Sequence, residues 1–184
     1  MIRTKTDLGR YLHLDNGYLH GGGCASRKAY MKRARDAEYF IGKYLEYLRK
    51  MEYHRNVNSS FIHKAAALYY ERRKNRLGNY LGFYIEANCF GEGLTLFHHG
   101  SIIVNPAARI GKNCKLHGNN CIGNNGTTNE CPVIGDNVDI GFGAVIIGNI
   151  EIADNITVGA NAVVNKSFME SGITIAGVPA RRVK

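Results

Sequence analysis

A six-residue spacing separates the aliphatic positions in the second half of the chain. Between Val104 and Val164, ten of the eleven positions at this spacing are aliphatic, and only Thr128 interrupts them. The aliphatic members are Val104, Ile110, Leu116, Ile122, Ile134, Ile140, Ile146, Ile152, Val158 and Val164. A period of six matches neither the 3.6-residue helix nor the two-residue strand alternation. We therefore predict short strands joined by corners, three per coil, that stack into a parallel β-helix of triangular cross-section.

The positions around each aliphatic residue refine this prediction. The next residue is usually small or Asn, as at Gly111, Gly135 and Gly141, which suits a left-handed backbone at the corner. Between Ile122 and Ile134 the run 124–132 is polar and rich in turn residues. We expect this run to leave the coil as a loop, where substrate contacts are common.

The first part of the chain has helical periodicity instead. We predict a short helix over residues 4–15 with Thr4 or Thr6 as N-cap, followed by a break at Gly21-Gly22-Gly23. A long amphipathic helix is expected over residues 26–53.

A last helix precedes the repeat. Ser59 or Ser60 is its expected N-cap, it runs to about Arg76, and Gly78 is its expected stop. We expect these helices to cover the first open edge of the β-helix, because an exposed sheet edge invites aggregation.

Charge divides the chain at the same place. Residues 1–80 carry 17 basic and 7 acidic groups, a difference of +10, whereas residues 81–184 carry 7 and 8, a difference of −1. We predict an α-helical N-terminal region, 1–80, and a β-helix domain with a C-terminal tail, 81–184. The basic residues are interspersed with Asp and Glu and no nucleic-acid motif accompanies them, so we expect a solvated face and no nucleic-acid partner. An anionic partner, a membrane surface and the attraction of an anionic coenzyme stay open.

Composition narrows the class of protein. Hydrophobic residues make up 45% and charged residues 21% of the chain, as in ordinary globular proteins. No run of about 18 apolar residues exists, and the first residues lack an apolar signal core, so we expect a cytoplasmic protein. The five cysteines form no close metal-ligand pair, and Cys114 falls in an inward slot of the repeat.

Three segments add a family resemblance to the repeat. The stretch 104–111, the run 146–152 and the close 176–181 together resemble left-handed β-helix acyltransferases. Within this superfamily they are most similar to serine acetyltransferases and to O-acetyltransferases of surface-polysaccharide pathways. The resemblance covers about residues 90–184 and implies a mainly β, left-handed fold, a homotrimer, and acetyl-CoA as co-substrate without a metal.

His117 is the leading candidate for catalysis. Acetyl transfer from a thioester to a hydroxyl needs a base near neutrality, and histidine supplies one. His117 follows Leu116 at a corner, and its segment resembles the catalytic-histidine segment of the family. The alternative is a structural histidine in a left-handed corner. His98 and His99 form a second candidate pair, and His99, eighteen residues earlier, is expected to neighbour His117 from the preceding coil, ~4.8 Å away.

The residues expected to bind serine differ from the family pattern. Where serine acetyltransferases carry an Asp and a His before Pro, this chain has Ile103 and Asn105; where they carry Arg-His-Pro, it has Glu130-Cys131-Pro132. We therefore expect the acceptor to be a sugar or glycan intermediate of surface-polysaccharide synthesis, which allows peripheral contact with a membrane-linked glycan. Serine is the alternative acceptor. The candidate acceptor contacts are Asn105, Asn119, Glu130 and Cys131.

The coenzyme site follows from the resemblance. Family members lay the pantetheine arm in a groove between subunits, held by main-chain groups and by basic residues near the phosphates. A backbone N–H near Gly141 to Gly143 is the expected oxyanion donor. The matching positions are Gly141, Phe142, Ala144, Ala160, Asn165, Lys166, Arg181 and Arg182.

Three other functions stay open. Cys131 is a candidate nucleophile, although no base lies beside it in sequence. Carbonic-anhydrase-like metal chemistry would use histidines from adjacent subunits, and His99 and His117 on neighbouring coils are the candidates to mimic such ligands. A binding trimer would only present its basic helices to an anionic surface.

Overall fold

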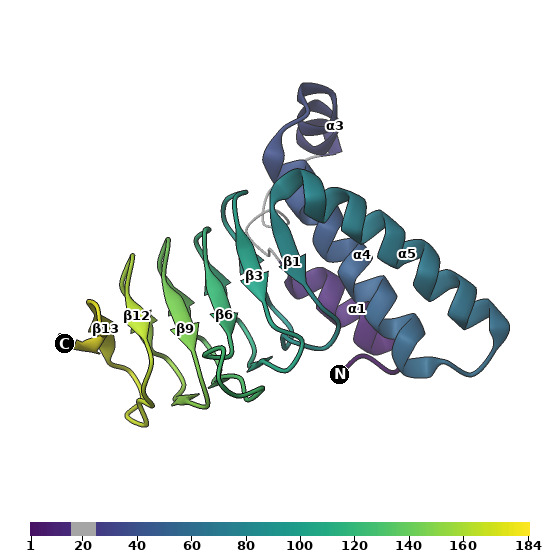
Figure 1. The fold of residues 1–184 in the computed structure, drawn as a ribbon. Helices are drawn as coiled ribbons and strands as arrows, with labels where there is room; N and C mark the ends of the chain where they lie inside the picture. The colour runs from purple at the N-terminus through teal and green to yellow at the C-terminus, as the bar shows by residue number, and fades with distance from the viewer. Residues whose placement is uncertain (16–24) are drawn as a thin grey trace.

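The computed structural model describes residues 1–15 and 25–184 of the chain. Helices come first and strands follow, and the elements form a helical cap beside a column of stacked coils (Figure 1). The predicted break at Gly21-Gly22-Gly23 lies outside the described residues. The helices are α1 (Lys5–Leu14), α3 (Ala25–Ala34), α4 (Ala37–Val57) and α5 (Phe61–Leu81).

The strands form the three faces of a triangular prism. Sheet A contains β1 (Phe83–Ile85), β3 (Ile102–Val104), β6 (Cys121–Gly123), β9 (Val145–Ile147) and β12 (Val163–Val164). Sheet B contains β4 (Arg109–Ile110), β7 (Val133–Ile134) and β10 (Glu151–Ile152). Sheet C contains β2 (Thr95–Leu96), β5 (Lys115–Leu116), β8 (Asp139–Ile140), β11 (Thr157–Val158), β13 (Thr174–Ala176) and β14 (Arg181–Arg182). The pairings between coils are parallel, and β14 alone folds back antiparallel onto β13.

The six-residue repeat forms the core of this prism. Each of the ten aliphatic residues from Val104 to Val164 is at most 5% exposed, and equivalent residues such as Leu116 and Ile140 pair between coils. Thr128 is exposed in the predicted loop, which lengthens the third coil. The mainly β, left-handed parallel β-helix is confirmed, and burial of this aliphatic column is its main source of stability.

The left-handed corners lie two residues later than predicted. Gly111, Gly135 and Gly141 do not have a positive φ; they are small because the next coil passes close to them. A Cβ on Gly141 would lie 2.7 Å from the backbone N of Ala160. The positive φ falls mainly on asparagines three positions after the aliphatic residue, namely Asn113, Asn119, Asn137, Asn155 and Asn161.

Two of the predicted helix bounds are wrong. The helix expected over 26–53 is interrupted: Arg35 has a φ of 55°, and the Asp36 side chain accepts from the N–H of Glu38 at 2.8 Å to begin α4. The last helix passes through Gly78 and ends at Gly82, which has a φ of 83°. Thr4 and Ser60 do act as N-caps, as predicted.

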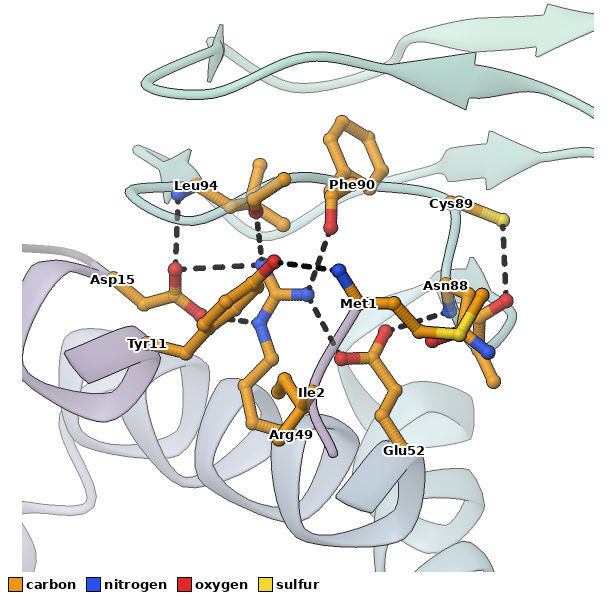
Figure 2. A network of polar contacts seen from close by, with 12 residues as sticks. Met1, Ile2, Tyr11, Asp15, Arg49, Glu52, Asn88, Cys89, Phe90 and Leu94 are labelled. Carbon is orange, nitrogen blue, oxygen red and sulfur yellow. Dashed lines mark hydrogen bonds and ion pairs between the residues drawn. The ribbon is translucent and has the colours of Figure 1, made fainter. Parts of the chain in front are cut away.

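A buried arginine joins the helices to the first coil (Figure 2). Arg49 of α4 donates to Asp15 at 2.6 Å and to Glu52 at 2.9 Å. The three side chains also bind backbone groups of the first coil: the carbonyls of Phe90 and Gly91 and the N–H groups of Asn88, Gly93 and Leu94. The open edge of the β-helix therefore has partners for these polar groups, and the predicted helical cap is confirmed.

Among the described residues, we find no helix with the length and apolar character needed to span a membrane.

Candidate functional site

His117 lies at the corner where the chain passes from sheet C to sheet A. Its Nε2 is 2.7 Å from Oδ1 of Asp139, which is on β8 of the next coil. Its ring stacks on Phe97 of the preceding coil, with 4.5 Å between the ring centroids and 26° between the planes. The side chain is 36% exposed. A carboxylate on one ring nitrogen fixes the orientation of the imidazole and leaves Nδ1 available to a reactant.

The register between the first two coils corrects the prediction for His99. Leu96 pairs with Leu116, so the residue stacked on His117 is Phe97 and not His99. The first coil is two residues longer than the eighteen assumed. The Cβ of His98 lies beside Gly118, 3.6 Å from where a Cβ on that glycine would be, and His98 and His99 are both exposed. His99 and His117, the candidate metal ligands of the carbonic-anhydrase-like alternative, are therefore not stacked on each other within the chain.

His117 is not the left-handed residue of its corner. Gly118 has a φ of 119° and Asn119 a φ of 51°, whereas His117 has no positive φ. The backbone therefore gives no structural reason for a histidine at this position. Its contacts with Phe97 and Asp139 are what distinguish it.

The corner continues along the next two coils as a narrow edge of small residues. Gly141 and Ala160 occupy this edge, and the Phe142 ring stands out from it at 45% exposure. The N–H groups of Gly141 and Gly143 are used within the fold, donating to Val158 and Gly118. Within the described part of the chain, the backbone N–H groups of Phe142 and Ala160 have no partner.

One residue predicted to contact the coenzyme lies in the core instead. Ala144 is fully buried, its N–H donates to the carbonyl of Gly141, and its carbonyl accepts from Cys121. Its role is packing between coils, because no polar group of its own is available to a ligand.

The other predicted coenzyme contacts lie at the C-terminal coil. Lys166 follows β12 and places its Nζ over the Phe168 ring at 5.4 Å, whereas Arg182 on β14 forms an ion pair with Glu170 at 2.6 Å. Asn165 and Arg181 are exposed. Lys166 and Asn165 stand at the opposite edge of sheet A from Phe142 and Ala160.

The predicted acceptor contacts do not gather around His117 within one chain. Asn119 is at the His117 corner, where its Oδ1 accepts from the N–H of Ser101 at 2.9 Å. Asn105, Glu130 and Cys131 lie at the corner between sheets A and B. The width of sheet A, about three residues or ~10 Å, separates the two corners.

Cys131 lacks the environment of a catalytic thiolate. It is 8% exposed, and its Sγ contacts the carbonyl of Asn129 at 3.7 Å. Burial raises the pKa of its thiol, and Arg109 only partly opposes this. A raised pKa reduces the thiolate population, so the nucleophile alternative is disfavoured.

Sequence reasoning missed Asp139 and Phe97. Both precede or follow an aliphatic position by one residue, where side chains face outward. The coil lengths hid their proximity to His117: Leu96 and Leu116 are twenty residues apart, and Leu116 and Ile140 twenty-four. Aligning coils by their aliphatic residues, rather than by a fixed count of eighteen, would have found both.

The outer surface of sheet A carries an apolar stripe. Tyr84, Ile103, Cys121, Val145 and Val163 occupy equivalent outward positions on successive strands. Tyr84 and Ile103 are exposed to solvent and the other three are partly exposed. The stripe extends between the His117 corner and the Asn105 corner.

The fold and this corner define the chain as a hexapeptide-repeat, left-handed β-helix protein with a histidine–aspartate pair on one edge. In sequence it is similar to serine acetyltransferases, which confirms the resemblance seen in the repeat. It is 34% identical to the serine acetyltransferase of Buchnera aphidicola over 101 residues, which are 53% of this chain. It is 30% identical to the serine acetyltransferase of Synechococcus elongatus over 93 residues, which are 50% of this chain. The chain spans only 38% of the length of each of these relatives. No family model matches the chain.

Solved structures of serine acetyltransferases have a similar fold. Soybean serine acetyltransferase, as the apoenzyme, matches with a TM-score of 0.71 at 23% identity, covering 97% of this chain and 70% of that chain. The enzyme from Brucella abortus, in complex with coenzyme A, matches with a TM-score of 0.71 at 22% identity, covering 97% and 68%. These matches establish the fold. Both relatives and both solved structures are named serine acetyltransferase, and none of the four is named as a transferase to a glycan.

Proposed function

We propose that the protein is an acetyl-CoA-dependent O-acetyltransferase in which His117 is the general base. The observation that carries the proposal is the contact between His117 and Asp139 at an exposed corner, in a fold shared with serine acetyltransferases. Such a carboxylate–imidazole pair is the arrangement used to take a proton from a hydroxyl nucleophile.

The proposed chemistry is direct transfer without a covalent enzyme intermediate. Acetyl-CoA supplies the acetyl group as a thioester. His117 accepts the proton of the acceptor hydroxyl at Nδ1 while Asp139 holds Nε2 and stabilises the imidazolium that forms. The acceptor oxygen bonds to the acyl carbon, the carbon–sulfur bond breaks, and the proton on His117 passes to the departing thiolate.

The edge below His117 fits an extended coenzyme. The N–H groups of Phe142 and Ala160, which have no partner in the described part of the chain, are available to the carbonyls of a pantetheine arm or to the developing oxyanion. Phe142 lies within the range 141–143 in which the oxyanion donor is expected. Gly141 lets a ligand approach the backbone closely. Arg181, which pairs with Ala176 at this edge, is the proposed contact of the phosphate end. Lys166 and Asn165 lie at the opposite edge of sheet A and are proposed to reach the coenzyme from a neighbouring copy, whereas Arg182 is held by Glu170.

We also propose that the active site is completed in a homotrimer. The apolar stripe of sheet A supports this, because a contiguous exposed apolar surface favours burial against another copy. Packing across sheet A would bring the His117 corner of one copy toward the Asn105 and Glu130 corner of the next.

An Ile103→Lys, Val145→Lys double variant is expected to shift the species seen by light scattering from trimer to monomer, because it places charges in the apolar stripe. A wild-type protein that is monomeric would contradict the proposed trimer.

Serine is the first acceptor that we propose, since the relatives are serine acetyltransferases. A sugar hydroxyl is the second candidate. The loop 124–132 favours it, because its exposed side chains are mainly amides and hydroxyls, which suit a polyol better than a zwitterion. Cytoplasmic location, where acetyl-CoA is available, is part of the proposal.

The acceptor test measures acetyl-CoA consumption and product mass for the wild-type protein with serine, a panel of nucleotide sugars and simple glycosides. Acetylserine is the expected product. Turnover with sugars alone would replace serine by a glycan acceptor, and an absence of any turnover would contradict the proposed enzyme and favour the binding-trimer alternative.

A further inference from the structure

The outer side of α5 is exposed along the whole helix. Twelve exposed residues recur at three- and four-residue steps and so lie on one face. We call this surface the outer face of α5. It consists of Phe61, Ile62, Lys64, Ala65, Leu68, Tyr69, Arg72, Arg73, Asn75, Arg76, Asn79 and Tyr80. Figure 1 shows α5 beside α4, in the helical cap beyond β1.

The charge on this face has a single sign. Lys64, Arg72, Arg73 and Arg76 are its ionised residues, and along α5, which the structure describes in full, no carboxylate belongs to the face. The one acidic residue of α5, Glu71, is partly buried and accepts from Arg55 of α4 at 2.6 Å. The four cations therefore have no counter-charge on their own surface.

Large apolar side chains share the face with these cations. Phe61 is 82% and Ile62 75% exposed, and Leu68, Tyr69 and Tyr80 are more than half exposed. Five large apolar groups on one exposed helix face form a patch of the kind that marks an interaction site. Aliphatic and aromatic groups beside unpaired basic residues are typical of helices that lie in a membrane interface.

A groove beside the face brings some of its cations together with the neighbouring helix. Arg73 and Arg76 of α5 line it with Lys43 and Tyr47 of α4, and its volume is about 330 Å³. Arg73 also stands over the Tyr47 ring at 6.0 Å. Lys43 is paired with Glu46 at 2.6 Å, so Arg73 and Arg76 are the two cations of the groove that suit the phosphate of a headgroup.

From these observations we infer that the outer face of α5 docks the protein on an anionic lipid bilayer. The cations attract the negatively charged surface, and the apolar side chains enter the interface beside them. A second copy is a poorer occupant, because a two-fold contact through this face would bring eight cations together without carboxylates. A nucleic acid would use the cations but leave Ile62 and Leu68 exposed. The inference does not depend on the proposed acetyl transfer.

Vesicle flotation with the full chain tests this inference. The vesicles are phosphatidylcholine alone, or phosphatidylcholine with phosphatidylglycerol at about three to one, in roughly 0.1 M salt. The face variant is Arg72→Gln, Arg73→Gln, Arg76→Gln. The control variant, Arg3→Gln, Lys5→Gln, Lys112→Gln, removes the same number of exposed charges elsewhere. Circular dichroism checks that both are folded.

The wild type and the control are expected to float with the anionic vesicles and not with the neutral ones. The affinity of the face variant for anionic vesicles is expected to fall by about tenfold or more, since each basic residue near an anionic surface contributes substantially to the affinity. An Ile62→Ser, Leu68→Ser variant is expected to bind several-fold more weakly. Equal loss in face and control variants, absence of wild-type binding, or tighter binding to an RNA or DNA oligonucleotide than to vesicles would each overturn the inference.

Discussion

His117 is oriented by two residues that belong to different coils. Asp139 holds Nε2 from the next coil, and Phe97 covers the ring from the preceding coil. The candidate histidine could be predicted from its corner position, but its neighbours could not, because the prediction assumed coils of eighteen residues. The first coil carries extra residues at the 97–101 corner, and the third carries the loop 124–132. Each insertion shifts the sequence distance without disturbing the stacking of aliphatic residues.

Removing the carboxylate beside His117 tests this contact. Asp139→Asn is expected to lower kcat about 10- to 100-fold with little change in KM, because the amide does not stabilise the imidazolium. Steady-state acetyl-CoA consumption measures both constants. Asp136→Asn is the matched control, since Asp136 lies at another corner and accepts from the backbone N–H of Lys112 at 2.7 Å. A kcat of Asp139→Asn within twofold of the control would show that the contact is not used.

The coil is the element on which sequence and structure agree most closely. A strict aliphatic repeat predicts the strands, because the residue at this position of each coil enters the narrow interior. The backbone conformation of the corners was harder to predict, since a glycine directly after the aliphatic residue can be there for two reasons. Close approach of the next coil explains Gly111, whereas left-handed backbone explains Asn113. The break between α3 and α4 was missed because the amphipathic pattern continues across Arg35 and Asp36.

Two glycines at equivalent corner positions separate these explanations. A Cβ on Gly111 would lie 2.6 Å from the backbone of Gly135, whereas one on Gly123 would have its nearest neighbour at 3.6 Å, the Cβ of Asn105. Gly111→Ala is therefore expected to destabilise the fold by about 1–3 kcal/mol, and Gly123→Ala to be tolerated. Urea unfolding monitored by circular dichroism measures both. Equal effects would show that close approach is not the reason for glycine.

At the scale of the whole molecule, the helices and the β-helix meet through a buried charged network. We propose that 1–80 and 81–184 are two regions of one folding unit, because Arg49, Asp15 and Glu52 bind backbone groups of the first coil. Burial alone lowers the pKa of Arg49, but the carboxylates of Glu52 and Asp15 raise it above its ordinary value, so the guanidinium stays charged. No sequence pattern pointed to this network, since Asp15 is 34 residues from Arg49, and Arg49 and Glu52 resemble an ordinary surface pair three residues apart on a helix.

Replacing Arg49 tests whether the buried charged network stabilises the contact between the helices and the first coil. Arg49→Met is expected to cost about 3–5 kcal/mol, because it leaves Asp15 and Glu52 buried without a counter-charge. Lys50→Met, next to it on α4, removes an ion pair with Glu46 that is partly open to solvent and is expected to cost less than about 1 kcal/mol. Denaturant unfolding compares the two. A cost for Arg49→Met no larger than that of Lys50→Met would contradict this account of the cap.

The most direct test of the proposed catalytic base compares two neighbouring histidines. His117→Ala and His98→Ala remove imidazoles from the same corner, but only His117 contacts a carboxylate. Single-turnover acetyl transfer to the accepted substrate, followed by product mass, is the measurement. We predict that His117→Ala loses about 10²- to 10⁴-fold in rate and that His98→Ala stays within about tenfold of wild type. A fully active His117→Ala protein, or the larger loss in His98→Ala, would contradict the assignment of His117 as the base.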